Sequence, residues 1–526
     1  MKVALIQPLV VPGELRENLA RVSGLCRQAL SQGAELLLLP ENCLSGAWLG
    51  DLSDETLFYE ECEACEKELL EIAGGTPLLF GNAFVLGDNP RELSDFPEPV
   101  PYVFGQAERR RKALASLARE HRLAVAYVAS VSAGNAGKTW RAFDGRSSLF
   151  TASGALAAEL PAFEECARVV DTETSEVARP APEGTDDLFR AIALQTRMVM
   201  RLGGIRRVVV GASGGIDSCV TAALMGTIVD PDDLLLVNMP SRHNSATTKG
   251  IARALAENLG CRYAEVPVEP SVELTRNQLQ GLPVPRLGGK GAAPDAAADR
   301  LELSPLHFEN VQARDRGSRL LAAIAAAFGG VFTCNGNKAE TTVGYATLYG
   351  DCSGFFAPIA DLWKHQVYAL GRHLNEKVHG REIVPAAAFE IPPSAELSPD
   401  MDVEAGKGDP LVYPYHDFLF RWWTESEERP GPFASLSRFA DGTLAARIGA
   451  DPELVRRLFP DAASFVADLE RWWKAFKGMG AVKRVQCPPL AAVSPWAFGS
   501  EREEAVLPLF FPSKYVELKN SLLRKR

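Results

Sequence analysis

The feature that most constrains the fold of this chain is the segment 207–211 (RVVVG), which runs almost directly into two adjacent glycines. Its apolar residues do not alternate with polar ones, and such a strand is typical of a parallel sheet that is covered on both faces. Helix-like and strand-like segments surround it, at 188–203, 234–240, 246–259, 262–268, 308–328 and 331–335. This pattern predicts a doubly wound α/β sheet, which binds ligands beyond the carboxyl ends of its strands.

The residues before this sheet predict a separate, layered α/β domain over 1–170. Strand-like and helix-like runs alternate there, at 2–7, 14–32, 34–39, 55–73, 77–85, 106–120, 123–131 and 147–150. The segment 171–187 is acidic, contains two prolines and lacks periodicity. We therefore expect it to be a linker to a second domain over 188–526.

Length and composition favour a folded, soluble protein. The 526 residues are 46% hydrophobic and carry a formal charge of -11, which disfavours broad binding to nucleic acid or an anionic membrane. The longest apolar stretches fall short of the roughly 20 residues of a membrane helix. Gln7 and Pro8 interrupt the apolar N-terminus. We therefore interpret it as a strand rather than a signal peptide, and expect a cytoplasmic protein.

The ten cysteines have no regular spacing, which favours free thiols over a disulfide framework. Cys62 and Cys65 form one CxxC pair without a second Cys or His pair near it. We therefore interpret them as thiols on a helix surface rather than a metal or redox site. Residues 281–299, rich in Pro, Gly and Ala, are expected to form a mobile loop or insertion with a linking rather than a catalytic role.

The turn after strand 207–211 has the composition of a phosphate-binding loop. It reads ASGGIDS at 212–218 and leads into a helix from about Cys219. Adjacent glycines let backbone N–H groups close around an anion, and the helix N-terminus adds positive potential. The turn has neither the Gly-Lys-Ser/Thr of a Walker loop nor the three-glycine dinucleotide fingerprint. Its SGGIDS resembles the pyrophosphate loop of the N-type ATP pyrophosphatases.

Polar residues cluster again after residue 308. Asn310 and Arg314 are four residues apart and share one helix face, and Gln312 and Arg316 form a second such row. The segment 335–351 then offers many functional groups, at Lys338, Glu340, Tyr345, Thr347, Tyr349 and Asp351. Further motifs follow at 361–366 (DLWKHQ), 392–397 (PPSAEL), 409–417 (DPLVYPYHD) and 483–489 (KRVQCPP).

Taken in order, these motifs resemble the synthetase domain of NAD+ synthetases from about residue 190 to 500, in particular the glutamine-dependent class. The resemblance implies an adenine-nucleotide α-hydrolase-like (ATP pyrophosphatase) fold. It also implies a ligase reaction that uses ATP, Mg2+ and deamido-NAD. The nicotinate carboxylate is adenylated with release of pyrophosphate, and ammonia then displaces AMP. Family members are multi-subunit, so a homo-oligomer is expected.

The resemblance also implies roles for single residues. ATP and pyrophosphate would be bound by Gly211, Ser213, Gly214, Gly215, Asp217, Ser218, Asn335 and Lys364. Deamido-NAD would be bound by Asn310, Arg314, Glu340, Tyr345, Thr347 and Lys483. Asp217 and Glu340 would hold Mg2+, and the catalytic residues would be Asp217, Lys364 and Asp351. Asn335 stands where the family commonly has Thr, which weakens one nucleotide contact without removing the function.

The first segment resembles the nitrilase-like glutaminase domain of the same enzymes, in KVALIQ at 2–7, GAELLLLPE at 33–41 and FDG at 143–145. Glu41 matches the family's glutamate, whereas its lysine and its nucleophilic cysteine have no match. Residues 83–100 stand in place of both motifs and contain neither Lys nor Cys. The resemblance thus implies a shortened, inactive glutaminase domain that serves assembly and keeps Glu41 as a remnant. Nitrogen would come from free ammonia or from a separate glutaminase.

Two alternatives remain open. The chain could be an ATP-dependent amide ligase that acts on another carboxylate, although the retained Asn310, Arg314 and 345–351 favour deamido-NAD. It could instead be a non-catalytic nucleotide-binding regulator. The complete SGGIDS loop, together with Glu340 and Lys364, argues against that second alternative, because a regulator does not need a full magnesium and pyrophosphate site.

Overall fold

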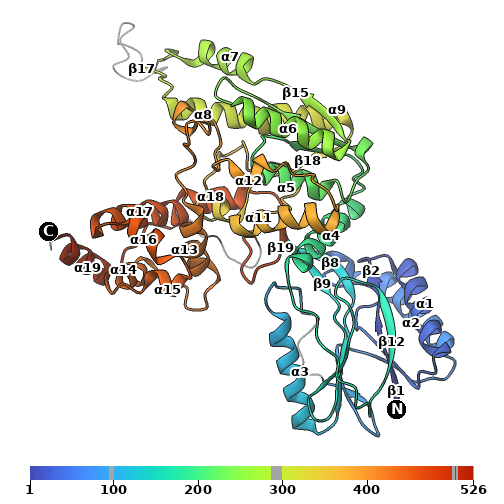
Figure 1. Cartoon of the computed structure of the whole chain (residues 1–526). Coiled ribbons are helices and arrows are strands. Elements are labelled where there is room, and N and C mark those ends of the chain that lie inside the picture. Colours follow the sequence, from blue (N-terminus) through green and yellow to red (C-terminus); the bar gives the residue numbers. More distant parts are fainter. Residues whose placement is uncertain (94–99, 286–298, 500–503, 505–506, 525–526) are drawn as a thin grey trace, which may run out of the picture. The chain divides into compact units, whose positions relative to one another are not determined.

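The computed structural model describes residues 1–93, 100–285, 299–499, 504 and 507–524. The chain divides into two compact units (Figure 1). Unit 1 comprises Met1–Gly203 and Ala491–Ser500, and unit 2 comprises Gly204–Leu490 and Glu501–Arg526. Each unit has its own sheets and core, so each is described by itself.

Unit 1 contains two facing sheets. The first has the order β12-β1-β3-β4, formed by Cys166–Asp171, Lys2–Gln7, Leu36–Leu39 and Leu78–Phe80. The second has the order β11-β10-β7-β5-β6, formed by Leu156–Glu159, Ser148–Phe150, Ala124–Tyr127, Ala83–Leu86 and Arg91–Glu92. A further sheet contains β2 (Leu9–Val10), β8 (Val131–Ala136), β9 (Thr139–Asp144) and β19 (Leu490–Ala492).

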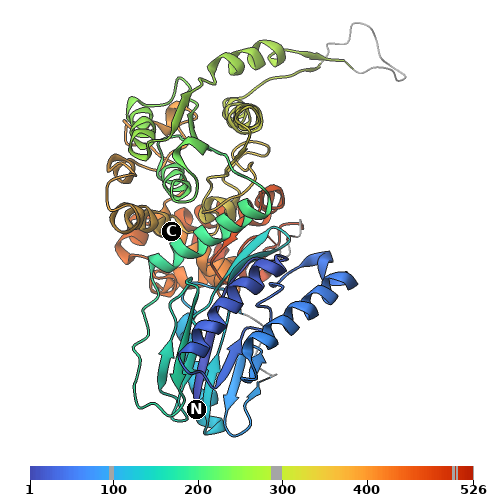
Figure 2. The same cartoon turned by 90° about the vertical axis from the view of Figure 1, so that its right-hand side faces the viewer.

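Helices cover the outer faces of the two facing sheets. Along β1, Val3 and Leu5 pack toward the second sheet, while Ala4 and Ile6 pack toward α1 (Leu15–Ser31). The helix α2 (Thr56–Ala73) lies beside α1 on that face (Figure 2), and α3 (Ala107–His121) packs on the second sheet. The predicted layered α/β architecture of this segment is therefore confirmed.

The helix α4 (Thr185–Leu202) groups with unit 1, although the sequence suggested that it opens the second domain. It packs against β8 and β9. Its buried Gln195 accepts from the backbone N–H of Ala492 at 3.0 Å and donates to the Ala492 carbonyl at 3.2 Å. The expected linker has no regular element over 172–184, but the boundary between the compact units follows Gly203.

The central sheet of unit 2 is fully parallel, in the order β15-β14-β13-β18. Its strands are Arg262–Glu265, Leu234–Asn238, Val208–Gly211 and Val331–Phe332. All three valines of β13 are fully buried, so both faces of the sheet are covered as predicted. The chain first extends the sheet to one side of β13 and then returns to its other side with β18. The topological switch point, where such folds bind ligands, therefore lies at β13.

The expected single helix over 308–328 is interrupted. It consists of α8 (Pro305–Arg314), a π-helical segment (Asp315–Leu321) and α9 (Ala322–Phe328). A Cβ on Gly317, within the π-helical segment, would lie 2.2 Å from the Gly350 carbonyl oxygen. The wider turn and the glycine let this helix approach the loop that ends at Asp351.

Further helices flank the sheet of unit 2. They are α5 (Ile216–Met225), α6 (Ala246–Leu259), α7 (Glu269–Leu279), α10 (Lys338–Val343), α11 (Lys364–His373) with a π-helical end (Leu374–Val378), and α12 (Ala387–Glu390). Short 3-10 turns lie at Gly50–Asp54 in unit 1 and at Pro231–Asp233 and Pro399–Met401 in unit 2. The hairpin of β16 (Pro283–Val284) and β17 (Asp299–Arg300) flanks residues 286–298. The expected mobile loop thus lies mostly outside the described residues.

A bundle of helices closes unit 2 (Figure 1). It contains α13 (Tyr413–Glu425), α14 (Pro432–Ala440), α15 (Leu444–Ile448), α16 (Pro452–Leu458), α17 (Ala462–Lys477), α18 (Met479–Gln486) and α19 (Ser513–Arg524). Its core is aromatic: Trp423 packs edge-on against Trp473 at 5.2 Å and stacks on Phe476 at 6.0 Å between ring centroids.

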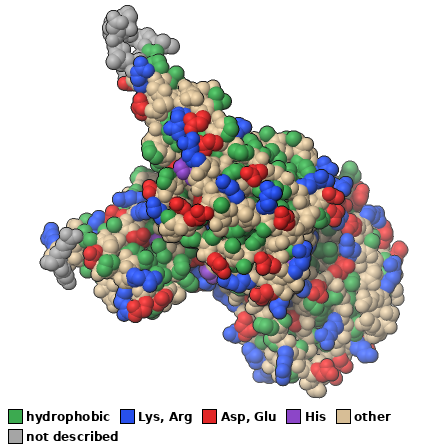
Figure 3. All heavy atoms as spheres, turned by 45° about the horizontal axis from the view of Figure 1, so that its top comes forward, with side chains coloured by type: hydrophobic (Ala, Val, Ile, Leu, Met, Phe, Trp, Pro, Cys, Tyr) green, Lys and Arg blue, Asp and Glu red, His purple; other side chains and the backbone are tan. Residues whose placement is uncertain are grey.

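All ten cysteines are free thiols, as predicted. The surface position expected for the CxxC pair is wrong for Cys65, which is buried in the core beneath α1, while Cys62 is half-buried. Within the described residues, none of the helices combines the length and the apolar character that a bilayer crossing requires. Acidic and basic side chains are interspersed on the face of each unit seen in Figure 3.

Candidate functional site

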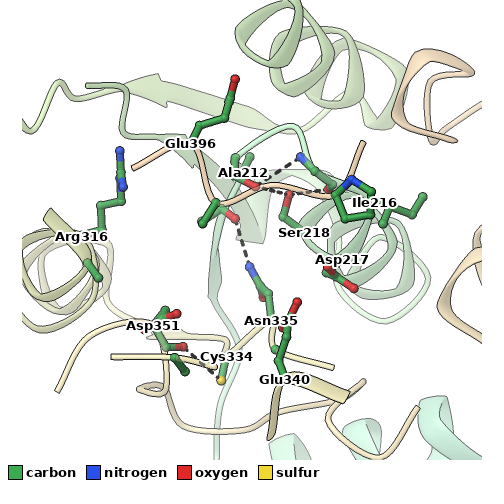
Figure 4. A pocket seen from close by; sticks show the side chains of 18 of the residues that line it. Ala212, Ile216, Asp217, Ser218, Arg316, Cys334, Asn335, Glu340, Asp351 and Glu396 are labelled. Atoms are coloured by element: carbon green, nitrogen blue, oxygen red, sulfur yellow. Dashed lines mark hydrogen bonds between the residues drawn. The ribbon is translucent and has the colours of Figure 1, made fainter. Parts of the chain in front are cut away.

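A cavity of about 290 Å3 opens in unit 2 at the carboxyl ends of β13, β14 and β18. It is lined by the turn after β13, by Asn335 and Glu340 after β18, and by Lys364 at the start of α11. Figure 4 shows Asp217 and Glu340 near each other, with Arg316 on the other side of the cavity. The structure thus brings residues from distant parts of the sequence to the switch point that the sheet topology indicates.

The SGGIDS turn is held in shape by its own serines. The Ser213 hydroxyl accepts from the backbone N–H of Gly215 at 3.2 Å and lies 3.1 Å from the Ser218 hydroxyl. Gly214 has a φ of 89°, and a Cβ there would lie 2.2 Å from the Thr248 carbonyl oxygen. Glycine is therefore required for both the backbone conformation and the close approach of α6.

Lys364 joins two carboxylates beside this turn. Its ammonium group donates to Asp217 in the first turn of α5 and lies 3.8 Å from Glu340 Oε1 in α10. Lys364 is only 3% exposed, so its charge depends on these partners. Three candidate residues that the sequence separates widely thus form one charged cluster.

Burial and neighbouring charges shift the pKa values of Glu340 and Lys364 in this cluster. Burial, followed by repulsion from Asp217, raises the pKa of Glu340 to about 8 even with Lys364 nearby. Burial alone would lower the pKa of Lys364, but attraction to Asp217 and Glu340 raises it above its ordinary value. The carboxylates therefore carry more negative charge than one lysine balances when Glu340 is ionised.

Asp409, from the 409–417 motif, is a third acidic group in this cluster, and no specific role was predicted for it. It accepts from the hydroxyls of Tyr345 and Tyr413 at 3.3 Å each, and from the backbone N–H of Ala395 at 3.2 Å. The Tyr413 hydroxyl also donates to Glu340 Oε1 at 3.0 Å. Burial raises the pKa of Asp409.

Asn335 and Asp351 both line the cavity, but each has a structural partner. The Asn335 side-chain amide donates to the Gly211 carbonyl at 3.0 Å, which ties the end of β18 to the end of β13. Asp351 Oδ1 accepts from the backbone N–H of Thr347 at 2.6 Å and so closes its own loop. The Asp351 side chain is accessible from the cavity yet surrounded by protein atoms, and this desolvation raises its pKa.

The residues expected to bind deamido-NAD gather around loop 344–351. Thr347 donates to Asn310 Oδ1 at 2.7 Å, and Arg314 donates to the Leu348 carbonyl at 3.0 Å. Lys483 donates to the Gly344 carbonyl at 2.7 Å and also to that of Ala346.

Of the expected deamido-NAD residues, Tyr345 and Glu340 line the described cavity, whereas Asn310, Arg314, Thr347 and Lys483 lie outside its lining and hold the loop.

Two further groups line the cavity without having been assigned a role. Arg316 donates to the Met239 carbonyl at 2.9 Å and to Asn244 Oδ1 at 3.2 Å, and burial lowers its pKa to about 10. Glu396 accepts from Thr248 Oγ1 at 2.7 Å and from the backbone N–H of Ser245 at 3.1 Å. Their motifs stood out in the sequence, at 309–316 and 392–397, but the spacing alone does not reveal these partners.

The donor set at the cavity fits a magnesium ion that is shared with a substrate. Within the part of the chain that the structure describes, no three His, Cys, Asp or Glu side chains are placed to hold a metal ion by themselves. Mg2+ commonly takes one or two protein carboxylates and completes its shell with water and substrate phosphates. Asp217 and Glu340, beside the glycine-rich turn that follows β13, match that chemistry.

In unit 1, Glu41 is exposed and accepts from the Asn82 side-chain amide at 3.3 Å. Cys43, two residues further on, is fully buried against α1 and α2, and burial strongly raises the pKa of its thiol. A buried thiol of this kind is a poor nucleophile.

Residues 189–427 match the NAD synthase family model. The glutamine-dependent NAD(+) synthetase of Rhodobacter capsulatus is 34% identical over 320 residues, which are 58% of this chain and 54% of that protein. This chain therefore spans only about half the length of such curated relatives.

Two solved structures share the fold over nearly the whole chain. The glutamine-dependent NAD(+) synthetase of Cytophaga hutchinsonii has a TM-score of 0.69 at 15% identity and covers 99% of both chains. The glutamine-dependent NAD+ synthetase of Acinetobacter baumannii, solved with adenosine diphosphate, has a TM-score of 0.59 at 21% identity and covers 96% of this chain and 98% of its own. Residues 189–427 thus resemble the NAD synthase family, and the chain has the two-domain α/β fold of solved glutamine-dependent NAD+ synthetases.

Proposed function

We propose that this protein is an NAD+ synthase that amidates deamido-NAD with ATP and takes its nitrogen from free ammonia. The observation that carries the proposal is the cluster of Lys364, Asp217 and Glu340 beside the SGGIDS turn. It offers an anion-binding turn, a buried cation and two carboxylates for a metal ion within one cavity. The synthetase of Acinetobacter baumannii was solved with adenosine diphosphate, which supports adenine-nucleotide binding in this fold.

In the first half-reaction a carboxylate oxygen of deamido-NAD attacks the α-phosphorus of ATP. The bond between that phosphorus and the bridging oxygen breaks, so that pyrophosphate leaves with the electron pair and an acyl adenylate remains. The SGGIDS turn, through Ser213, Gly214, Gly215 and Ser218, would bind the departing pyrophosphate. Lys364 would balance its growing negative charge. Mg2+, held by Asp217 and Glu340, would supply further charge neutralisation on the triphosphate.

In the second half-reaction ammonia attacks the acyl carbon, the bond from that carbon to the phosphate oxygen breaks, and AMP leaves. The attacking nitrogen loses one proton to solvent, which leaves the neutral amide. The loop 344–351, held by Asn310, Arg314 and Lys483, would seat deamido-NAD. Asp351, which lines the cavity, would be the catalytic carboxylate of this loop.

The proposal that the enzyme uses free ammonia, rather than ammonia released from glutamine by this chain, rests on unit 1. Residues 83–93 form β5 and the start of its hairpin, and Glu92 folds back so that its carboxylate accepts from the Asn82 backbone N–H at 3.3 Å. Residues 83–100, which stand in place of the family's lysine and cysteine motifs, contain neither Lys nor Cys, and this supports an inactive glutaminase domain. Glu41 would thus be a remnant, unit 1 would serve assembly of a homo-oligomer, and a separate glutaminase could also deliver ammonia.

The substrate is tested by pyrophosphate release. Purified protein, ATP and Mg2+ should release pyrophosphate when deamido-NAD is added, and little without it. Release with another carboxylate but not with deamido-NAD would favour a different amide ligase. Tight ATP binding without any release would favour the non-catalytic regulator.

A further inference from the structure

Asn337 contacts both of the proposed metal carboxylates. Its side-chain amide donates to Asp217 Oδ1 at 3.3 Å, and its backbone N–H donates to Glu340 Oε2 at 3.2 Å. In return, Asn337 Oδ1 accepts from the backbone N–H of Glu340 at 3.2 Å. One side chain thus connects the first turn of α5 to the first turn of α10.

The surroundings of Asn337 leave it little freedom. It is fully buried, and the next residue, Lys338, is fully buried as well. Lys338 pairs with Asp361 at 2.8 Å and with Glu425 at 2.7 Å, which fixes the start of α10 from its other side. Because Asn337 is itself held in place, it can fix the orientation of the two carboxylates that it contacts.

Two carboxylates that face one cavity repel each other and would otherwise turn apart. Lys364 attracts both of them but acts as a point charge and does not set their orientation. The two donors of Asn337 have fixed directions: its side-chain amide holds Asp217 Oδ1, and its backbone N–H holds Glu340 Oε2. This leaves Asp217 Oδ2 and Glu340 Oε1 on the side of Lys364.

We propose that Asn337 is a positioning residue that holds Asp217 and Glu340 in the arrangement that binds a divalent cation. This inference rests on the proposed function, because it assumes that these two carboxylates are the metal ligands. It assigns to Asn337 a role beyond capping α10.

The test distinguishes the contact of the Asn337 side chain with Asp217 from its capping of α10. Asn337→Ser keeps a side-chain oxygen that can cap α10 but is too short to reach Asp217, whereas Asn337→Ala removes both functions. Binding of Mn2+ is measured by electron paramagnetic resonance on the full chain with α,β-methylene-ATP, and thermal unfolding is measured in parallel. We expect both variants to weaken Mn2+ binding by roughly 10-fold or more. Asn337→Ala should also unfold at a lower temperature than Asn337→Ser.

Two controls complete the experiment. Asp461→Ala removes the N-cap of α17, where Asp461 accepts from the Ser464 backbone N–H at 2.8 Å, and it should lower thermal stability without changing Mn2+ binding. Asp217→Asn should abolish Mn2+ binding, and its failure to do so would overturn the metal site itself. If Asp217→Asn abolishes binding but Asn337→Ser binds Mn2+ like the wild type, Asn337 is a helix cap only and the inference is wrong.

Discussion

The ammonium group of Lys364 contacts the carboxylate of Asp217 although the two residues lie 147 positions apart in the sequence. Lys364 opens α11, and Asp217 lies in the first turn of α5. The two helices pack against each other, so the contact is set by the fold of unit 2 rather than by a flexible surface pair.

Removal of this lysine should abolish most of the synthetase activity. Lys364→Met leaves Asp217 and Glu340 without their buried cation and removes positive charge from the departing pyrophosphate. We expect kcat with ammonium to fall by about 100- to 1,000-fold. Lys474→Met is the matched control, because Lys474 is 54% exposed and pairs with Glu470 at 3.3 Å on α17. Equal activity of the two variants would show that Lys364 does not act on the reaction.

Gly214→Ala should damage the nucleotide site. The φ of 89° and the approach to the Thr248 carbonyl oxygen exclude a Cβ, so the turn must shift at a cost of about 1–3 kcal/mol from backbone strain alone. We expect weaker ATP binding by calorimetry and a lower free energy of unfolding.

Gly250→Ala is the control for that substitution. Gly250 lies in α6 with nothing within 4 Å of its added Cβ. Alanine there should stabilise the protein by up to about 1 kcal/mol and leave ATP binding unchanged. Equal ATP affinities for both glycine variants would contradict the role of the turn.

The metal-free protein should lose stability as the pH rises toward 8. Burial and Asp217 raise the pKa of Glu340 to about 8, against about 4.3 in an unfolded chain. Between these values the folded state holds a proton that the unfolded state releases. The stabilisation is therefore full below about pH 4 and is lost as the pH rises through about 8. Lys364, Asp217, Asp409 and Tyr413 face this carboxylate and contribute to its environment.

Thermal unfolding in the presence of a chelator, from pH 5 to pH 9, checks this expectation. Glu340→Gln should flatten the decline, while Glu257→Gln, at an exposed position on α6, should leave it unchanged. An identical decline in wild type and Glu340→Gln would assign the proton to another group.

Lys483→Met should weaken the use of deamido-NAD more than the use of ATP. Lys483 donates to the Gly344 and Ala346 carbonyls and so holds the loop that is proposed to seat deamido-NAD. We expect the KM for deamido-NAD to rise several-fold with little change in the KM for ATP. Lys514→Met, at an exposed position on α19, should change neither. A rise in the KM for ATP alone would place Lys483 at the nucleotide instead.

Most elements near the cavity could be predicted from the sequence, because the burial of β13 and the periodicity of α6 are local properties. The π-helical segment Asp315–Leu321 could not, since its wider turn depends on the contact of Gly317 with the loop at Gly350. The grouping of α4 with unit 1 likewise depends on packing against β8 and β9, which the sequence does not express.

The candidate site, too, was only partly predictable from the sequence. The motifs identified Asp217, Glu340 and Lys364, which the structure brings together. Motif matching did not indicate that Asp409 joins them or that Asn337 bridges two of them, since both depend on contacts between distant segments. Asn310 and Arg314 share a helix face as predicted, yet they hold the loop rather than line the cavity.

The most direct test of the account is NAD+ formation by the purified full chain from deamido-NAD, ATP and Mg2+, with ammonium chloride in one reaction and glutamine in the other. Wild type and Glu41→Gln are compared in both reactions. The account predicts NAD+ with ammonium alone, at the same rate for both proteins. NAD+ formation with glutamine by wild type, lost in Glu41→Gln, would contradict it and show that unit 1 is an active glutaminase.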